Sequence, residues 1–311
     1  MDALTDRHGN EFEMRERDCP TCGVAPQRVL GLRGGRYHRY GEGVETRIVR
    51  CERCGLLFPN PFPYPRAPQK LYGDPTKYFE HHDTAQKIEG YRSLTRKLRA
   101  RCSTHAPPRV LDIGAGRGDF LHAARLEGVV DFVGLEFANA MIEHAREHFG
   151  ITLLAHTIES YAAEQDPEPF DAVILNAVLE HVYDPDSFIA AVAKVTKPSG
   201  VVYIDVPNEP NLMTHVGNFV AKVKRSPEVY NLQPTWSPYH VYGFNERALR
   251  ALLIKHGLVL EETRIHASPT VPHDGSLRDR SKSFVAGQAL RVGNWLGMGA
   301  NLFAWARKRI Y

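Results

Sequence analysis

One segment, VLDIGAGRGDFLHAARLEG at residues 110–128, constrains the fold of this chain more than any other. It begins like a buried strand, passes through Gly114, Gly116 and Gly118 at two-residue spacing, and continues with helical periodicity. Three glycines destabilise a helix start unless the backbone needs positive φ or close approach to another group. We therefore expect a strand, a glycine turn and a helix whose free N–H groups face an anionic or polar ligand.

The alternation of strand and helix continues along the chain. The expected strands are RVLDIG, VVDFVGLE, ITLLAH, FDAVILN, GVVYIDVP, LVLEETRI and NLFAWARKR, and the expected helices are 118–128, 138–149, 185–195 and ERALRALLIKHG. This order is typical of a parallel sheet covered by helices on both faces. The predicted fold class is α/β, with a Rossmann-like, doubly wound sheet and a small N-terminal zinc ribbon, which is argued below.

Three parts are expected along the chain. They are a cysteine-bearing module at 1–60, a linker and helical segment at 61–108, and a main domain at 109–311 with irregular insertions at 207–243 and 267–298. The proline-rich FPNPFPYPRAP (58–68) is interpreted as an ordered linker, because proline excludes a regular helix or a central strand. The basic face of the helix at 83–102, formed by Arg92, Arg96 and Arg99, is expected to be solvated. A further helix is expected at 284–292.

Composition excludes several classes of protein. The 311 residues are 43% hydrophobic, which allows a sizeable core, and the net charge of +3 gives no strong attraction to nucleic acid or anionic lipid. No apolar run is long enough to cross a bilayer, and the polar N-terminus is unlike a secretory signal. We expect a soluble cytoplasmic protein with reduced thiols. Its oligomeric state cannot be inferred from the sequence.

A carboxylate accompanies the glycine turn. Glu136 ends the second expected strand, 22 positions after Gly114, where a carboxylate can accept both hydroxyls of a ribose. The dinucleotide pattern G-x-G-x-x-G would need a third glycine at position 119, which is Asp119. The spacing therefore favours a nucleoside ligand but disfavours a nicotinamide oxidoreductase.

Asp112 and the three glycines together resemble motif I of class I S-adenosylmethionine-dependent methyltransferases. The segments VGLEFANAMIEHARE, FDAVILNAVLEHVYDP and TKPSG resemble further parts of that family, so the resemblance covers residues 109–206. A looser match continues through YHVYGFNERALRALLIKHGLVLEE. The resemblance implies S-adenosyl-L-methionine as cofactor and a seven-stranded sheet whose last strand is antiparallel.

The same resemblance implies positions for the cofactor. The methionine end would contact Asp112, Gly114, Ala115, Gly116 and Gly118; Glu136 would hold the ribose; Phe137 and Met141 would border the adenine; Asn176 and Ala177 would line the path to the methyl group. Many relatives carry an aspartate after the third strand, where this chain has AHTIES. We expect Glu159, or the backbone near Ile158, to take its place.

Two C-x-x-C pairs, Cys19–Cys22 and Cys51–Cys54, are separated by 28 residues. This paired spacing favours a zinc ion over free thiols or a redox pair. The ion is expected to be structural and not catalytic, because four thiolates leave no open coordination position. The module has ten arginines against nine acidic residues, so we expect no nucleic acid partner. With the following CGLLFPNPFP and LYGDPTKYF, it resembles the N-terminal segment of bacterial methyltransferases that act on small molecules, including sugar C-methyltransferases. Tyr72, Tyr78 and Phe79 would then wall the acceptor pocket or pack a linker.

Methyl transfer requires alignment and, for an O–H or C–H acceptor, a base. His181, His215 and His240 follow strands whose carboxyl ends should face the acceptor, and Tyr239 precedes His240. In the sugar C-methyltransferases that the chain resembles, a glutamate occupies the position of Tyr239, so its loss favours O-methylation. His181 is equally expected to order its loop through a hydrogen bond. The aromatic residues of 207–243 are expected either to bind a sugar or aromatic ring of the acceptor or to form the core of a folded lid.

We therefore predict an enzyme that methylates a small metabolite or a sugar or glycan hydroxyl, with S-adenosylmethionine as donor and a structural zinc ion. The alternatives are a sugar C-methyltransferase, an RNA base methyltransferase that binds through its zinc ribbon, and a non-catalytic zinc scaffold. The sequence does not identify the acceptor.

Overall fold

The computed structural model describes residues 3–71, 84–102, 106–163, 167–267 and 287–310. Within them, six strands form the main sheet in the order β11-β12-β10-β9-β7-β8. These strands are β7 (Val110–Ile113), β8 (Phe132–Leu135), β9 (Phe170–Asn176), β10 (Thr196–Pro207), β11 (Leu258–His266) and β12 (Asn301–Lys308). Strands β8, β7, β9 and β10 run parallel, and β12 pairs antiparallel with both β10 and β11. The α/β fold and the antiparallel last strand are confirmed.

The expected count of seven strands is wrong for the described residues. Residues 151–156 do not form a strand; they make one parallel bridge, Leu135 to Leu154. Two backbone hydrogen bonds flank it, from Glu136 N to Leu154 O and from Leu154 N to Gly134 O. The chain turns into α6 (Ile158–Ala163) before a longer ladder can form.

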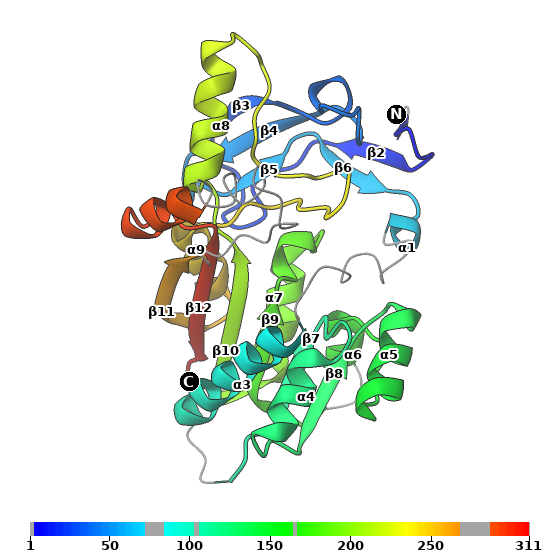
Figure 1. The fold of residues 1–311 in the computed structure, drawn as a ribbon, viewed down its shortest axis with the longest axis vertical. Coiled ribbons are helices and arrows are strands. Elements are labelled where there is room, and N and C mark those ends of the chain that lie inside the picture. Colours follow the sequence, from blue (N-terminus) through cyan, green and yellow to red (C-terminus); the bar gives the residue numbers. More distant parts are fainter. Residues whose placement is uncertain (1–2, 72–83, 103–105, 164–166, 268–286, 311) are drawn as a thin grey trace, which may run out of the picture.

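Helices cover both faces of the main sheet (Figure 1). One face packs against α3 (Thr84–Arg101), α4 (Asp119–Leu126) and α5 (Asn139–Phe149), and the other against α6, α7 (Pro185–Val195) and α9 (Glu246–Lys255). The arginine face of α3 is not simply solvated: Arg92 and Arg96 pair with Glu127, and Arg99 donates to its carbonyl. This basic face therefore fastens α3 to the end of α4. No helix among the described residues is both long and apolar enough to cross a membrane.

The N-terminal region forms two small sheets, β1-β2-β6 and β3-β4-β5. Its elements are β1 (Leu4–Thr5), β2 (Glu11–Arg15), β3 (Gln27–Arg33), η1 (Gly35–Tyr37), β4 (Thr46–Cys51), β5 (Leu57–Pro59), β6 (Phe62–Pro65) and α1 (Pro68–Leu71). The expected proline-rich linker thus contains two strands. Both lie at sheet edges, where a missing N–H is tolerated. Because β6 pairs with β2, strand pairing of the N-terminal region continues past residue 60.

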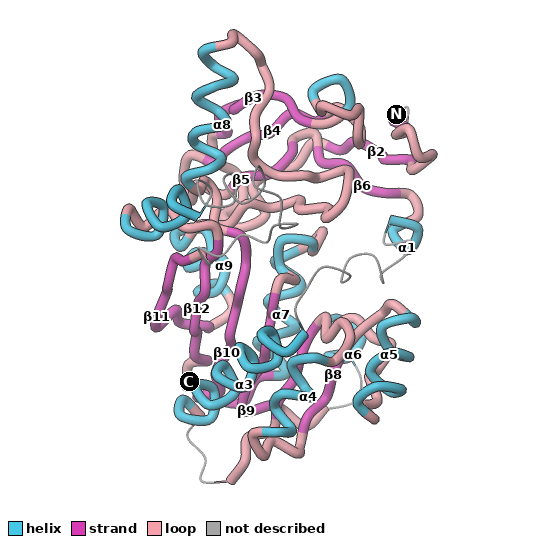
Figure 2. The backbone as a smooth tube through the Cα atoms, in the orientation of Figure 1, coloured by secondary structure: helices cyan, strands magenta, loops and turns pink. Residues whose placement is uncertain are grey.

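The segment after β10 joins the two regions. It contains a helix that the sequence analysis missed, α8 (Leu212–Val223), and then crosses the N-terminal sheets as a long loop (Figure 2). Leu57 and Gly243 exchange two backbone hydrogen bonds, and Asn208 bridges to Phe244. The N-terminal sheets therefore lie beyond the carboxyl end of β10. A further helix spans 287–295.

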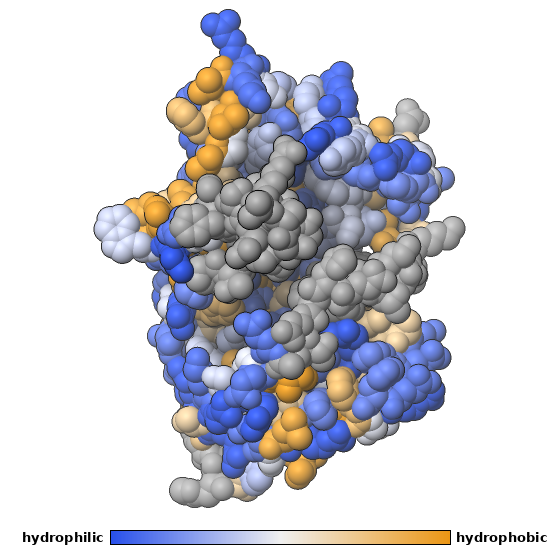
Figure 3. Space-filling view, in the orientation of Figure 1, coloured by the Kyte–Doolittle hydropathy of each residue, from blue (hydrophilic) through white to orange (hydrophobic). Residues whose placement is uncertain are grey.

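Helix α8 stands out from the surface with apolar side chains exposed (Figure 3). Its exposed apolar residues are Met213, Val216, Phe219, Val220 and Val223. Asn211 and Thr214 form a capping box at its start.

Candidate functional site

The glycine turn lies between β7 and α4. Gly114, Gly116 and Gly118 all have positive φ, at 68°, 53° and 79°. A Cβ added to Gly114 would meet Val178 Cγ2 at 2.7 Å, and one added to Gly118 would meet Ala145 Cβ at 3.1 Å. Both conformation and close packing therefore require glycine here.

Glu136, directly after β8, turns its carboxylate toward this turn. Its Oε2 accepts from Gly116 N at 2.9 Å, while Oε1 accepts from Phe137 N at 2.8 Å and Ala138 N at 2.9 Å. The residue is 8% exposed. A carboxylate has about four acceptor positions, so these three bonds leave one for a ligand unless a hydroxyl displaces an amide.

Two further acidic residues lie near the turn. Burial, and next the charge of Glu136, raise the pKa of Asp112 well above its usual range. Asp119, which the sequence analysis treated only as a break in a glycine pattern, is buried, and Lys87 Nζ lies 3.1 Å from its Oδ2. Its Oδ1 is buried without a hydrogen-bond partner among the described residues. A buried, unsatisfied carboxylate oxygen at a helix start is suited to a cationic or N–H group of a ligand.

The other residues expected at the cofactor divide by burial. Ala115, Met141 and Ile158 are buried, whereas Phe137, Glu159 and Ala177 are exposed. Ala177 has a φ of 56° at the end of β9 and donates its N–H to Asp205 O. Asn176 donates its side-chain amide to Tyr91 OH at 2.7 Å. Tyr91 lies on α3, and the sequence analysis did not identify it as part of the site.

The structure brings His181 and His240 together beyond the carboxyl end of β9, where the acceptor is expected. His181 ends the short helix η2 (Leu179–His181) after β9, and its ring centroid lies 4.9 Å from that of His240. Glu180 adds a carboxylate oxygen 3.8 Å from His181 Nε2. Backbone N–H groups of Val241 and Tyr242 donate to Glu180 O, which holds the loop with His240 against η2.

The other two expected catalytic residues lie differently. Tyr239 has a φ of 63° and supplies its carbonyl to His181 Nδ1 at 3.3 Å. Its ring packs beside a cluster with Phe12 and Val44 of the N-terminal region. His215 is exposed on α8, and no contact joins it to His181 or His240 in the described part of the chain.

Burial shifts the pKa values of the ionisable groups around His181 and His240. It lowers the pKa of His181 to about 4 and that of His240 to about 3, so both rings are neutral at pH 7. Burial also raises the pKa of Glu180 to about 8 and that of Asp205, at the end of β10, to about 6. At pH 7 the two rings and Glu180 are therefore mostly neutral, whereas Asp205 is mostly ionised.

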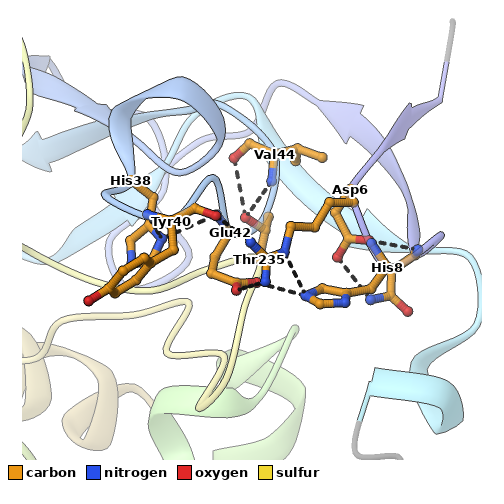
Figure 4. Close-up of polar contacts among 9 residues, drawn as sticks. Asp6, His8, His38, Tyr40, Glu42, Val44 and Thr235 are labelled. Carbon is orange, nitrogen blue, oxygen red and sulfur yellow. Dashed lines mark hydrogen bonds and ion pairs between the residues drawn. The ribbon is translucent and has the colours of Figure 1, made fainter.

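The N-terminal region supports the loop that carries His240. Thr235 Oγ1 accepts from Val44 N at 3.1 Å and contacts Val44 O at 3.2 Å (Figure 4). Beside this contact, His8 Nε2 lies 2.8 Å from Glu42 Oε2. Trp236 and Tyr242 are buried and Tyr230 is partly exposed, so the first two form the core of this segment. Tyr72, Tyr78 and Phe79 lie outside the described residues.

The four cysteines meet at one point next to the main core. The Sγ atoms of Cys19 and Cys54 are 3.6 Å apart, those of Cys22 and Cys51 are 3.4 Å apart, and all four lie within 4.8 Å of one another. A tetrahedral zinc ion with Zn–S of about 2.3 Å needs sulfur separations of about 3.8 Å. Gly23 N and Gly55 N donate to Cys19 O and Cys51 O, which closes each pair into a turn. The donor set fits a structural zinc ion.

Comparisons with known proteins agree with this architecture. A family model described as a methyltransferase domain matches residues 83–263. The ubiquinone biosynthesis O-methyltransferase of Vibrio atlanticus is 37% identical over 105 residues, which cover 32% of this chain and 44% of that protein. Its counterpart in Neisseria meningitidis serogroup A is 33% identical over 107 residues, with 32% and 44% covered. The chain thus spans less than half the length of these curated relatives.

Solved structures are more distant in sequence. A SAM-dependent methyltransferase from Archaeoglobus fulgidus is 19% identical, with a TM-score of 0.49 over 71% of this chain and 94% of that one. The Burkholderia thailandensis 1,6-didemethyltoxoflavin-N1-methyltransferase is 17% identical, with a TM-score of 0.49 over 78% and 85%.

Proposed function

The chain belongs to the methyltransferase domain family, and we propose that it transfers a methyl group from S-adenosylmethionine to a hydroxyl oxygen of a small molecule. The acceptor oxygen attacks the methyl carbon, the sulfur–carbon bond breaks, and S-adenosylhomocysteine and a proton are released. The donor supplies an activated methyl group. The protein must then align the acceptor, exclude water and help to remove the proton.

The observation that carries the proposal is the hydrogen bond from Gly116 N to Glu136 Oε2. It places a carboxylate beside a side-chain-free turn at the carboxyl ends of two adjacent parallel strands, where nucleosides bind in such sheets. In this proposal Glu136 accepts from the ribose. Asp112 and residues 114–118 bind the methionine end, and Phe137 and Met141 border the adenine. Residues 158–159 complete the adenine side, and Asn176 and Ala177 line the path to the methyl group.

The acceptor side supports proton removal from a hydroxyl group. The rings of His181 and His240 are the neighbouring imidazoles there, and an imidazole nitrogen can accept the proton as methyl transfer proceeds. Tyr239 orients His181 through its carbonyl. The similar proteins from Vibrio atlanticus and Neisseria meningitidis are named as O-methyltransferases, which supports oxygen as the methylated atom.

We also propose that zinc has a structural role, held by Cys19, Cys22, Cys51 and Cys54. These thiolates would fill its coordination, so the ion would take no part in methyl transfer. It would keep the N-terminal region under the loop that carries His240.

Calorimetry tests the cofactor assignment. S-adenosylhomocysteine should bind and NAD should not, and Gly116→Val should abolish binding. Gly150→Val is the matched control, because Gly150 also has positive φ, 61°, but caps the far end of α5. Tighter binding of NAD would contradict the proposal. Incubating the enzyme with S-adenosylmethionine and a panel of hydroxyl compounds, with O-methyl products identified by mass spectrometry and NMR, tests the acceptor class.

A further inference from the structure

We propose that Glu180, His181 and His240 bind a divalent first-row metal ion at the acceptor side of the site, separate from the four-cysteine cluster. One ligand atom from each of the three lies within 4.8 Å of the other two. Ligands about 2.1 Å from an ion are about 3.0 Å apart in adjacent octahedral positions. His181 Nε2 and Glu180 Oε1 are 3.8 Å apart, so they would move about 0.8 Å closer on binding an ion.

The buried carboxyl group of Glu180 has too few hydrogen-bond partners. The residue is 1% exposed, and its Oε2 has no hydrogen-bond partner among the described residues. No lysine or arginine in that part of the chain forms an ion pair with it; its one ion-pair contact is the long approach to His181. A buried carboxyl oxygen without a hydrogen-bond partner gives up the bonds that it would make with water. A bound cation would compensate for this loss.

His181 is already arranged as a ligand. Its Nδ1 lies 3.3 Å from Tyr239 O, and a carbonyl can only accept, so Nδ1 carries the hydrogen. The lone pair therefore lies on Nε2, the nitrogen that faces Glu180. Metal-binding histidines commonly donate their second ring N–H to a backbone carbonyl in this way. The backbone bonds from Val241 N and Tyr242 N to Glu180 O hold His240 beside the other two ligands.

Two imidazoles and one carboxylate define the kind of ion. This donor set suits Fe²⁺, Mn²⁺, Co²⁺ or Zn²⁺, and it leaves coordination positions open, unlike a four-thiolate site. The consequence for chemistry rests on the proposed function: an open position could accept the acceptor hydroxyl and lower its pKa, so that its proton is lost to solvent. The two ring nitrogens would then be ligands instead of bases.

The test uses the full chain with its cysteine cluster loaded with zinc. Mn²⁺ is the probe, because it favours oxygen and nitrogen donors over thiolates, and its free form gives an EPR signal that decreases on binding. We expect one Mn²⁺ per zinc-loaded chain. Glu180→Gln and His240→Asn should each weaken binding about tenfold or more, whereas His256→Asn, which removes an imidazole 2.8 Å from Asp186, should not.

The wild-type protein alone decides the outcome if the variants fail to fold. If it binds neither Mn²⁺ nor a second equivalent of Zn²⁺ or Co²⁺ beyond the cysteine cluster, the proposal is wrong. Binding that survives in both variants also overturns it. Because binding of S-adenosylhomocysteine is measured separately, its failure would contradict the proposed function and leave the metal site unaffected.

Discussion

The carboxylate of Glu136 accepts a hydrogen bond from the backbone amide of Gly116 at 2.9 Å, which joins the ends of β7 and β8. We predict that Glu136→Gln weakens binding of S-adenosylhomocysteine about 10- to 100-fold. The variant replaces one acceptor oxygen with an NH₂ group, and hydrogen bonds to charged groups contribute about 1.5–3 kcal/mol each. Calorimetry measures the change. Glu143→Gln, at an exposed position of α5, should bind like the wild type, and equal affinities for all three proteins would exclude the ribose role.

The cysteine cluster should be required for stability. Cys22→Ser is expected to abolish zinc binding and lower the free energy of unfolding by several kcal/mol, because three of the four cysteines are buried in the same core cluster as the main sheet. Metal analysis and thermal unfolding measure both effects. Cys102→Ser is the control, since Cys102 lies outside the cluster and contacts Asp171 O at 3.9 Å. A Cys22→Ser variant as stable as the wild type would show that the ion is dispensable.

Arg17 should contribute more to stability than its neighbour Arg15. Its Nη1 donates to Tyr242 OH at 2.7 Å and Tyr183 O at 3.0 Å, so it connects the N-terminal region to the main domain. We expect Arg17→Ala to cost about 2–3 kcal/mol, because buried acceptors lose a charged donor. Arg15→Ala, which removes a surface pair with Glu13, should lower stability far less. Urea unfolding compares the two; similar losses would contradict this role.

Deprotonation of Glu209 should lower the free energy of unfolding as the pH rises from about 4.5 to about 7. Burial raises the pKa of Glu209 from 4.5 to about 7, although Asn231 donates to its Oε2 at 2.6 Å. The folded state therefore binds the proton more tightly than the unfolded state, and it loses up to about 3 kcal/mol of relative stability across this window. Glu209→Gln should remove the part of this slope that Glu209 contributes, while the buried carboxyls of Glu180 and Asp205, whose pKa values are also raised, keep theirs. Urea unfolding at a series of pH values measures it, and an unchanged slope in the variant would show that Glu209 titrates normally.

The core of the main domain could be predicted from the sequence because its signals are local. The glycines at 114, 116 and 118 permit the positive φ that the turn adopts, and the strands β7 and β9 are short apolar runs. The expected strand at 151–156 failed because a strand also needs a partner along its length, and only Leu154 meets β8. Helix α8 had a readable signal in its capping box, but its apolar side faces outward and gives no core pattern.

The site was less predictable because it depends on contacts distant in sequence. His181, His215 and His240 were all expected beside the acceptor; the rings of His181 and His240 are neighbours, whereas His215 is exposed on α8. Nothing local indicates that Glu180 is buried without a partner for its Oε2 among the described residues. Tyr239 was expected beside the chemistry, yet its ring packs with N-terminal residues. Asp119 meets Lys87 only when α3 packs on α4, and Tyr91 meets Asn176 only when α3 packs against the end of β9.

The paired backbone bonds between Leu57 and Gly243 have a consequence for evolution and for protein engineering. If the loop at 224–245 were replaced with that of a relative, the new loop would lack the N-terminal surface against which it packs, unless residues 1–65 were replaced with it. We would therefore expect substitutions in these two segments to occur together in proteins that evolve from this chain, and a change of substrate to alter both.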